Sequence, residues 1–162
     1  MTDAFSHEYA CTVLHSAEQD VLFVIKNRPD WQAGKLNFPG GKIEPGEKPL
    51  QAALRELAEE AKLALMPQQM THFLTLNKPG QWRVFFFKAM VPKHVLYALE
   101  AGTDERLSVQ KAYQILPDFP EDYPMKVLPC VYGVSMALKL AMTPGLELPL
   151  YIRVQNEYNS NY

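Results

Sequence analysis

The chain has 162 residues, a length typical of a single domain and sufficient to bury a hydrophobic core. Its lysines and arginines number 16 and its aspartates and glutamates 18, so the formal net charge of -2 provides no overall positive field for DNA, RNA or an acidic membrane surface. An anionic substrate would therefore have to be bound by local groups.

The cysteines and the amino-terminal residues indicate the cellular compartment that we expect for the protein. Cys11 and Cys130 lie far apart and match neither a metal-ligand spacing nor a dense disulfide pattern, which favours a reducing cytoplasm. Residues 1–10 lack the basic patch and apolar run of a signal peptide, and no apolar stretch reaches the ~18 residues that span a bilayer. We expect a cytoplasmic protein without stable nucleic-acid binding; a homodimer is compatible with the sequence.

The first part of the chain predicts a hairpin followed by an ordered loop. Two β-rich runs, 9–14 and 21–25, are separated by a polar turn. Prolines and glycines then punctuate residues 28–34 and 39–46, as in a loop of defined shape. Such punctuation before a helix often marks a functional site.

A helix is predicted to begin near Pro49, because proline suits the first helical turn, and Pro67 marks its end. Apolar residues recur on one face of this helix, so that face should pack on a sheet. These residues are Leu50, Ala53, Leu54, Leu57 and Ala61.

The second half of the chain predicts another hairpin and then mixed elements. The expected elements are strands at 71–76 and 82–91 around a turn at 78–80, a short helix at 94–99, an acidic turn at 102–106, a strand at 107–115, a helix at 129–142 and an extended run at 148–154. Together they predict a single domain over residues 1–154, followed by a polar tail, 155–162, whose composition is typical of disorder.

Three glutamates stand out on the first predicted helix. Glu56, Glu59 and Glu60 occupy positions i, i+3 and i+4, so their carboxylates share one side of the helix. Their repulsion costs only ~0.2 to 0.5 kcal/mol per pair, so a solvated acidic face is the alternative. The preceding Gly40 and Gly41 favour a metal site, because they let the backbone bend tightly and present carbonyl oxygens. A hard cation such as Mg²⁺ prefers oxygen ligands and would make the patch attract phosphate.

The spacing of these residues resembles the signature of Nudix hydrolases. Gly41 is followed after five residues by Glu47 and after seven more by the run Arg-Glu-Leu-Ala-Glu-Glu at 55–60. The chain matches eight of the nine fixed positions and departs at Lys62, where the family usually has glycine. Glycine there tolerates a left-handed backbone, which lysine adopts with some strain. The departure removes no metal ligand.

The resemblance implies an α+β fold, the Nudix-type α/β/α sandwich with a mixed β-sheet between helices. It also implies hydrolysis of the phosphoanhydride in a nucleoside diphosphate linked to another moiety, with Mg²⁺, or Mn²⁺ as a substitute, activating the attacking water. The implied metal ligands are the Gly41 carbonyl, Glu56, Glu59 and Glu60.

Other positions receive supporting roles from the resemblance. Arg55 and Glu47 would hold the metal-binding carboxylates in position. The family places its general base on different elements, and Glu105 or Asp104 in the acidic turn are the candidates here. Lys26 and Arg28 are candidates for binding a substrate phosphate, with ordinary surface charge as the equal alternative.

The substrate is less well defined by the sequence. Phe38 is a candidate for the nucleobase pocket, with core packing as the alternative. Pro79 lies where a proline is associated with ADP-ribose-cleaving members, which favours ADP-ribose or another sugar nucleotide slightly over nucleoside triphosphates; a Pro-Gly turn also accounts for it. A catalytically silent nucleotide-sensing module is the alternative function. An isoprenoid-diphosphate isomerase is disfavoured by the position of Cys130.

Overall fold

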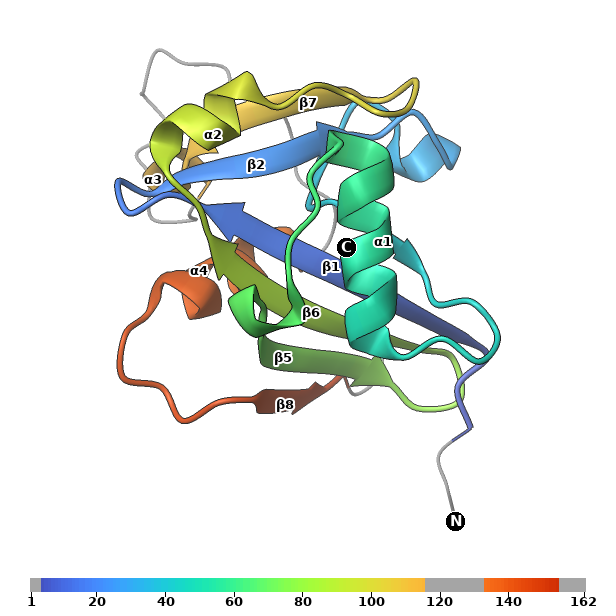
Figure 1. Cartoon of the computed structure of the whole chain (residues 1–162). Helices are drawn as coiled ribbons and strands as arrows, with labels where there is room; N and C mark the ends of the chain where they lie inside the picture. Colours follow the sequence, from blue (N-terminus) through green and yellow to red (C-terminus); the bar gives the residue numbers. More distant parts are fainter. Residues whose placement is uncertain (1–3, 116–132, 155–162) are drawn as a thin grey trace, which may run out of the picture.

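The computed structural model describes residues 4–115 and 133–154 (Figure 1). The strands are β1 (His7–His15), β2 (Asp20–Ile25), β3 (Leu36–Asn37), β4 (Gly40–Lys42), β5 (Thr71–Lys78), β6 (Trp82–Met90), β7 (Arg106–Lys111) and β8 (Leu150–Arg153). The helices are α1 (Pro49–Ala61), α2 (Lys93–Ala98), α3 (Ala112–Ile115) and α4 (Val134–Met142), with 3-10 turns at Asp30–Gln32 and Pro67–Gln69. None of the helices in these ranges is both long and apolar enough to cross a membrane.

Within these ranges the strands form one mixed sheet in the order β3-β2-β1-β6-β5-β8, with β4 paired to β1 and β7 to β2. β1 runs parallel to β6 over its whole length, from His7 beside Trp82 to His15 beside Met90. β5 also runs parallel to β8, whereas β1–β2 and β5–β6 are antiparallel pairs. Both predicted hairpins are therefore confirmed.

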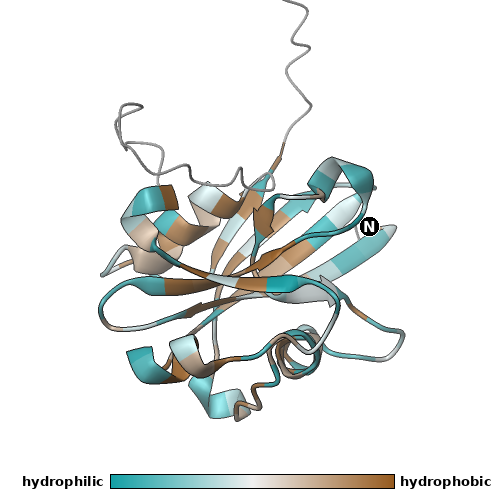
Figure 2. Ribbon diagram, turned by 90° about the horizontal axis from the view of Figure 1, so that it is seen from above, coloured by the Kyte–Doolittle hydropathy of each residue, from teal (hydrophilic) through white to brown (hydrophobic). Residues whose placement is uncertain are grey.

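Helices cover both faces of the sheet, and each face has its own apolar core. One cluster joins the sheet to α1 and α2, and the other joins it to α3 and α4. Figure 2 shows hydrophobic residues in the strands that lie between the two helical layers. In α1, Ala53, Leu57 and Ala61 are buried, and Leu50 and Leu54 are partly buried against the sheet. The α+β sandwich and the packing face of α1 are confirmed.

Local hydrogen bonds explain where elements begin and end. α1 begins at Pro49, as predicted, and the backbone N–H of Lys48 donates to Gln51 Oε1 at 2.9 Å. The helix ends at Ala61, so the prediction that Pro67 marks its end is wrong; Lys62 turns left-handed and Pro67 begins a 3-10 turn instead. 

The later elements agree in part with the sequence. α2 begins and ends one residue before the helix predicted at 94–99, and β8 falls within the extended run predicted at 148–154. The strand expected at 107–115 stops at Lys111, where α3 begins and the Gln114 side chain accepts a 3.0 Å hydrogen bond from the Lys111 N–H. The end of the helix predicted at 129–142 is present as α4, while its expected start and the tail at 155–162 lie outside the described residues.

Candidate metal and substrate site

The signature glutamates lie on the side of α1 that faces the loop containing β4. The Glu60 side chain is 8% exposed, and its Oε2 accepts a 2.8 Å hydrogen bond from the Gly40 N–H. The Glu56 side chain is 14% exposed, whereas that of Glu59 is 55% exposed. Packing of the apolar face thus fixes the rotation of α1 and directs two of the three carboxylates into the interior.

The two glycines before the helix are required by close approach. A side chain on Gly40 would collide with the Ala10 carbonyl and Cys11 of β1. A Cβ on Gly41 would occupy the space of the Glu56 carboxylate. Gly40 therefore permits the close approach of the loop to β1, and Gly41 permits its close approach to α1.

Arg55 links the glutamates to the loop. Its Nε and Nη2 donate to the two oxygens of Glu47 at 2.9 and 3.1 Å, a bidentate pair. Its Nη1 donates to Glu56 Oε1 at 2.8 Å and to Glu59 Oε2 at 3.3 Å, and Nη2 also reaches the Lys42 carbonyl at 3.1 Å. This geometry is suited to positioning carboxylates; that role stays a prediction.

The acidic turn brings a fourth carboxylate to the site. Glu105 is 7% exposed, and its Oε1 accepts a 3.1 Å hydrogen bond from the Asn27 N–H. Lys26 Nζ lies 3.0 Å from Glu105 Oε2 and 3.9 Å from Glu60 Oε1. Lys26 therefore connects the turn to the end of α1.

The same turn docks on the carboxyl end of α1. The Gly102 N–H donates a 2.9 Å hydrogen bond to the Glu60 carbonyl, and a Cβ on Gly102 would collide with the Glu59 carbonyl. Lys62 adopts the left-handed conformation, with φ 52°, so lysine takes here the backbone shape that glycine tolerates without strain. Its Nζ lies 3.6 Å from Glu100 Oε2. Gly102 thus satisfies one of the carbonyl groups that a helix end leaves unpaired.

Burial changes the electrostatics of these carboxyl groups. Burial raises the pKa of Glu60 to about 7, against the opposing effects of the Gly40 hydrogen bond and Lys26. Burial also raises the pKa of Glu56, although Arg55 opposes the change. By contrast, hydrogen bonds from Arg55 and from the Glu44 backbone lower the pKa of Glu47. A bound cation would favour the ionised form of Glu60 and Glu56.

The donor chemistry fits a hard divalent cation, because every candidate ligand is an oxygen and the Gly41 cradle leaves the Glu56 carboxylate room beside the backbone. In the ranges that the structure describes, no three His, Cys, Asp or Glu side chains are close enough to hold one ion. Arg55 binds Glu56 and Glu59, while Gly40 and Lys26 engage Glu60, and these contacts direct the carboxylates apart.

Two of the residues predicted to bind substrate, Arg28 and Phe38, do not lie beside the signature glutamates. Arg28 is 79% exposed at its side chain and lies 3.7 Å from Asp104 Oδ1, so this pair remains on the surface. Phe38 is 1% exposed and stacks on Phe23 with ring centroids 5.4 Å apart. Its position is that of a core residue.

A match to known proteins decides the family. A NUDIX domain profile matches residues 6–124. The chain belongs to the Nudix family. Two curated relatives are both named 8-oxo-dGTP diphosphatase: that of Escherichia coli (strain K12) is 46% identical over 61 residues, and that of Haemophilus influenzae (strain ATCC 51907 / DSM 11121 / KW20 / Rd) is 38% identical over 55 residues. These matches cover 37% and 34% of this chain and 46% and 40% of the relatives, so the chain spans less than half the length of either.

Solved structures share the Nudix fold at lower identity. A mutT/nudix family protein from Listeria innocua has a TM-score of 0.65 and 21% identity, covering 85% of this chain and 92% of that chain. A MutT NUDIX hydrolase from Burkholderia pseudomallei has a TM-score of 0.62 and 18% identity, covering 83% and 96%. These similarities show the fold.

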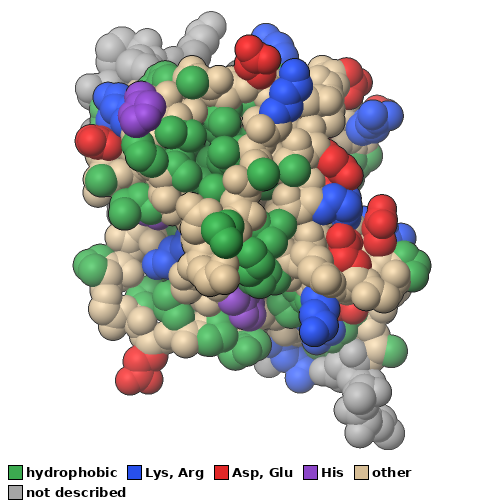
Figure 3. All heavy atoms as spheres, in the orientation of Figure 1, with side chains coloured by type: hydrophobic (Ala, Val, Ile, Leu, Met, Phe, Trp, Pro, Cys, Tyr) green, Lys and Arg blue, Asp and Glu red, His purple; other side chains and the backbone are tan. Residues whose placement is uncertain are grey.

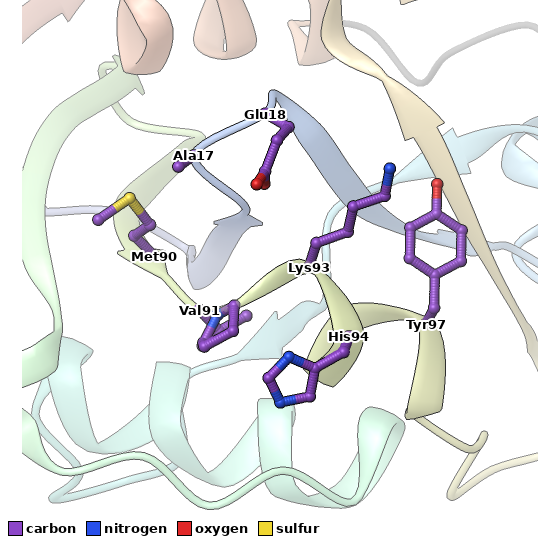
Figure 4. A pocket seen from close by; sticks show the side chains of 8 residues that line it. Ala17, Glu18, Met90, Val91, Lys93, His94 and Tyr97 are labelled. Atoms are coloured by element: carbon purple, nitrogen blue, oxygen red, sulfur yellow. The ribbon is translucent and has the colours of Figure 1, made fainter.

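Two hollows lie on different parts of this Nudix domain. A hollow of about 620 Å³ adjoins Glu47, Arg55 and Glu56. Figure 3 shows acidic and basic side chains interspersed on the side of the molecule that carries α1. A second hollow of about 700 Å³ lies between the β1–β2 turn and α2, and its described lining includes Lys93 and Tyr97 but none of the signature glutamates (Figure 4).

Sequence reasoning missed two features of the site. The sequence predicts a phosphate ligand or a surface charge at Lys26, whereas the structure pairs this residue with Glu60 and Glu105. The sequence places Gly102 in the acidic turn but does not predict its contact with α1. A glycine inside an acidic turn, in a chain whose signature lacks its terminal glycine, is the signal that could have indicated this contact.

Proposed function

We propose that this Nudix domain is a divalent-metal-dependent pyrophosphohydrolase acting on a nucleoside triphosphate. The observation that carries the proposal is the fit between loop and helix, where the Gly40 N–H binds Glu60 and Gly41 has no room for a side chain beside Glu56. This arrangement places the Glu56 and Glu60 carboxylates against the glycine loop, and a hollow adjoins Arg55 and Glu56.

In this proposal, one group of residues binds the metal and another positions the metal-binding carboxylates. The Gly41 carbonyl, Glu56, Glu59 and Glu60 would hold Mg²⁺, or Mn²⁺ in its place. When bound, the cation supplies positive charge against the phosphates and lowers the pKa of water. Arg55 keeps the carboxylates oriented through its contacts with Glu47, Glu56 and Glu59.

We assign proton removal and phosphate binding to residues that lie outside α1. Glu105 is the proposed general base, because it is buried beside Glu60 while Asp104 faces solvent with Arg28. Lys26 lies among the carboxylates and would bind a substrate phosphate; Arg28 would do so at the rim. Attack of the deprotonated water on the phosphoanhydride would release a nucleoside monophosphate and pyrophosphate.

The substrate class rests on the curated relatives. Both are named for 8-oxo-dGTP, a nucleoside triphosphate, and this makes 8-oxo-dGTP the first compound to test. The slight sequence preference for ADP-ribose gains no support from them. Pro79 lies in the β5–β6 turn before Gly80, which has φ 73°, and that turn accounts for the proline.

A substrate screen tests the proposal. The full chain is incubated with 8-oxo-dGTP, dGTP, ADP-ribose and a dinucleoside polyphosphate, with Mg²⁺, with Mn²⁺ and with EDTA, and the products are separated by ion-exchange chromatography. We expect metal-dependent formation of monophosphate and pyrophosphate, fastest from a triphosphate. If ADP-ribose were cleaved faster than the triphosphates, the substrate class would be a sugar nucleotide and not a nucleoside triphosphate. Nucleotide binding without turnover under every metal condition would favour the silent sensing module and contradict the proposal.

A further inference from the structure

Lys26 is the cation that lies between two buried carboxylates from distant parts of the chain. Its Nζ is 3.0 Å from Glu105 Oε2 and 3.9 Å from Glu60 Oε1. Both glutamate side chains are 8% exposed, and that of Lys26 is 16% exposed. Ionised carboxylates at such burial need a compensating charge, and Lys26 supplies it.

The other carboxylates of the site have a different counter-ion. Arg55 binds Glu47, Glu56 and Glu59 through its guanidinium. The acidic groups are therefore divided between two cationic side chains that arise from different elements. A divalent ion that drew Glu60 together with the other α1 glutamates would approach the position of the Lys26 ammonium and be repelled by it.

The backbone of Lys26 is fixed while its side chain is long and rotatable. Its N–H donates to the Lys35 carbonyl at 3.0 Å, and its carbonyl accepts a 2.8 Å hydrogen bond from the Gly34 N–H. Exchange of partners by Lys26 would therefore move the four-carbon side chain and leave the backbone in place.

We propose that Lys26 is an internal counter-ion that stabilises the metal-free site and is displaced from Glu60 and Glu105 when the divalent cation binds. This positioning role rests on the metal dependence of the proposed function. Once displaced, the ammonium lies at the rim of the carboxylate cluster with its charge free for a substrate phosphate. Lys26 thus opposes metal binding and assists phosphate binding.

The two roles predict opposite effects of one substitution. Lys26→Met removes the charge but keeps a long apolar side chain. At pH 8, the metal-free chain without its counter-ion should unfold at a lower temperature in EDTA, because two buried carboxylates face each other. The same variant should bind Mn²⁺ with a several-fold lower Kd, because no ammonium competes for the position. A merely structural lysine would lower stability and weaken metal binding together.

The test measures free Mn²⁺ by electron paramagnetic resonance during titration of the full chain, alongside thermal unfolding in EDTA. Lys35→Met is the matched control, since it makes the same chemical change on the residue whose backbone pairs with Lys26; it should leave Kd unchanged. Lys26→Arg retains a positive charge and should not lower Kd. If Lys26→Met folds and binds Mn²⁺ no more tightly than the wild type, the proposal is overturned.

A second measurement uses nuclear magnetic resonance of the wild-type chain, and a variant is needed only to assign the Lys26 signal. The Lys26 ¹³Cε–¹Hε resonance, identified by its absence in Lys26→Arg, should move towards the position of an exposed lysine when Mg²⁺ is added to the wild type. An unchanged resonance at saturating Mg²⁺ would overturn the proposal, as would absence of any divalent-ion binding. Failure of every nucleotide to be hydrolysed while these shifts occur would contradict only the proposed function.

Discussion

The Gly40 backbone N–H donates a 2.8 Å hydrogen bond to the carboxylate of Glu60, a residue 20 positions later in the chain. This contact joins the glycine loop to the last turn of α1, and Gly41 beside Glu56 makes a second close approach one helical turn earlier. The spacing between the glycines and the glutamates in the sequence therefore corresponds to a direct fit between loop and helix.

Arg55 should be needed as a guanidinium and not only as a charge. Arg55→Lys loses the bidentate pair with Glu47 and cannot also reach Glu56 and Glu59. We expect kcat for the best nucleotide substrate to fall about 10- to 100-fold, the usual effect of removing a group that orients metal ligands. Arg153→Lys, at an exposed position of β8, is the control. Equal kcat for both variants would exclude the orienting role.

Metal binding should strengthen with pH through neutrality. The pKa of Glu60 is raised to about 7, so below that pH a proton must leave before a cation can use the carboxylate. The Kd for Mn²⁺ should fall by up to about tenfold per pH unit between pH 6 and 7 and level off above. Glu60→Gln should remove this slope. A slope that persists in Glu60→Gln would assign the proton to another group.

The same raised pKa has a defined effect on stability without metal. Between pH 4.5 and about 7, the folded chain holds a proton on Glu60 that the unfolded chain, with a pKa near 4.5, has already released. Stability in EDTA should therefore fall as pH rises from about 4.5 to about 7. Urea unfolding across this range, with Glu60→Gln as the comparison, measures the contribution.

The left-handed turn at Lys62 should carry a small cost that glycine removes. Lys62→Gly should stabilise the chain by up to about 1 kcal/mol, because the left-handed conformation is unfavourable for a side chain with a Cβ. The ion pair with Glu100 joins side chains that are 59% and 79% exposed, so its loss should matter little. Lys62→Ala loses the same ion pair but keeps the Cβ and should not stabilise. Equal unfolding free energies for the two variants would contradict this explanation.

Local chemistry explains how much of the fold could be predicted. Pro49 suits a first helical turn, and alternation of apolar residues marks both hairpins, so these elements follow from neighbouring residues. β7 ends early where α3 begins, and the Gln114 side chain of α3 accepts a hydrogen bond from the Lys111 N–H. The alternation of residues in the sequence does not report that this helical turn forms.

The candidate site also combines features that follow from the local sequence with contacts that do not. The signature places Glu56, Glu59 and Glu60 on one helix face by periodicity alone. The pairing of Lys26 with Glu105 spans 79 positions and depends on how the acidic turn packs on the end of α1. Such a contact arises from the tertiary fold and has no local pattern from which it could be predicted.

Asp20 is a buried carboxylate that lies outside the site, and its pKa shifts in the opposite direction to that of Glu60. Burial raises its pKa, but hydrogen bonds from Lys111, Tyr97 and Ser16 outweigh that effect and leave the pKa below its usual range. Asp20→Asn should lower the unfolding free energy by about 1 to 3 kcal/mol, since buried donors lose a charged acceptor. Activity per folded molecule should not change.

The pH dependence of this contribution follows from the lowered pKa. Asp20 should stabilise the fold fully above its unfolded pKa of about 3.8 and progressively less as pH falls through the lower folded value. Guanidinium unfolding of the wild type and Asp20→Asn at pH 6 and pH 3 should give a smaller difference at pH 3. An equal difference at both values would mean that ionisation of Asp20 is not the source of its effect.

The most direct test of the central claim is hydrolysis of 8-oxo-dGTP by the double variant Glu59→Gln/Glu60→Gln in Mg²⁺. Glutamine keeps one oxygen for the Gly40 N–H, so circular dichroism and thermal unfolding should resemble the wild type, while kcat/KM should fall at least about a hundredfold. Glu18→Gln, in the β1–β2 turn, should hydrolyse normally. A folded double variant that hydrolyses the nucleotide at the wild-type rate would contradict a metal-dependent site built on these carboxylates.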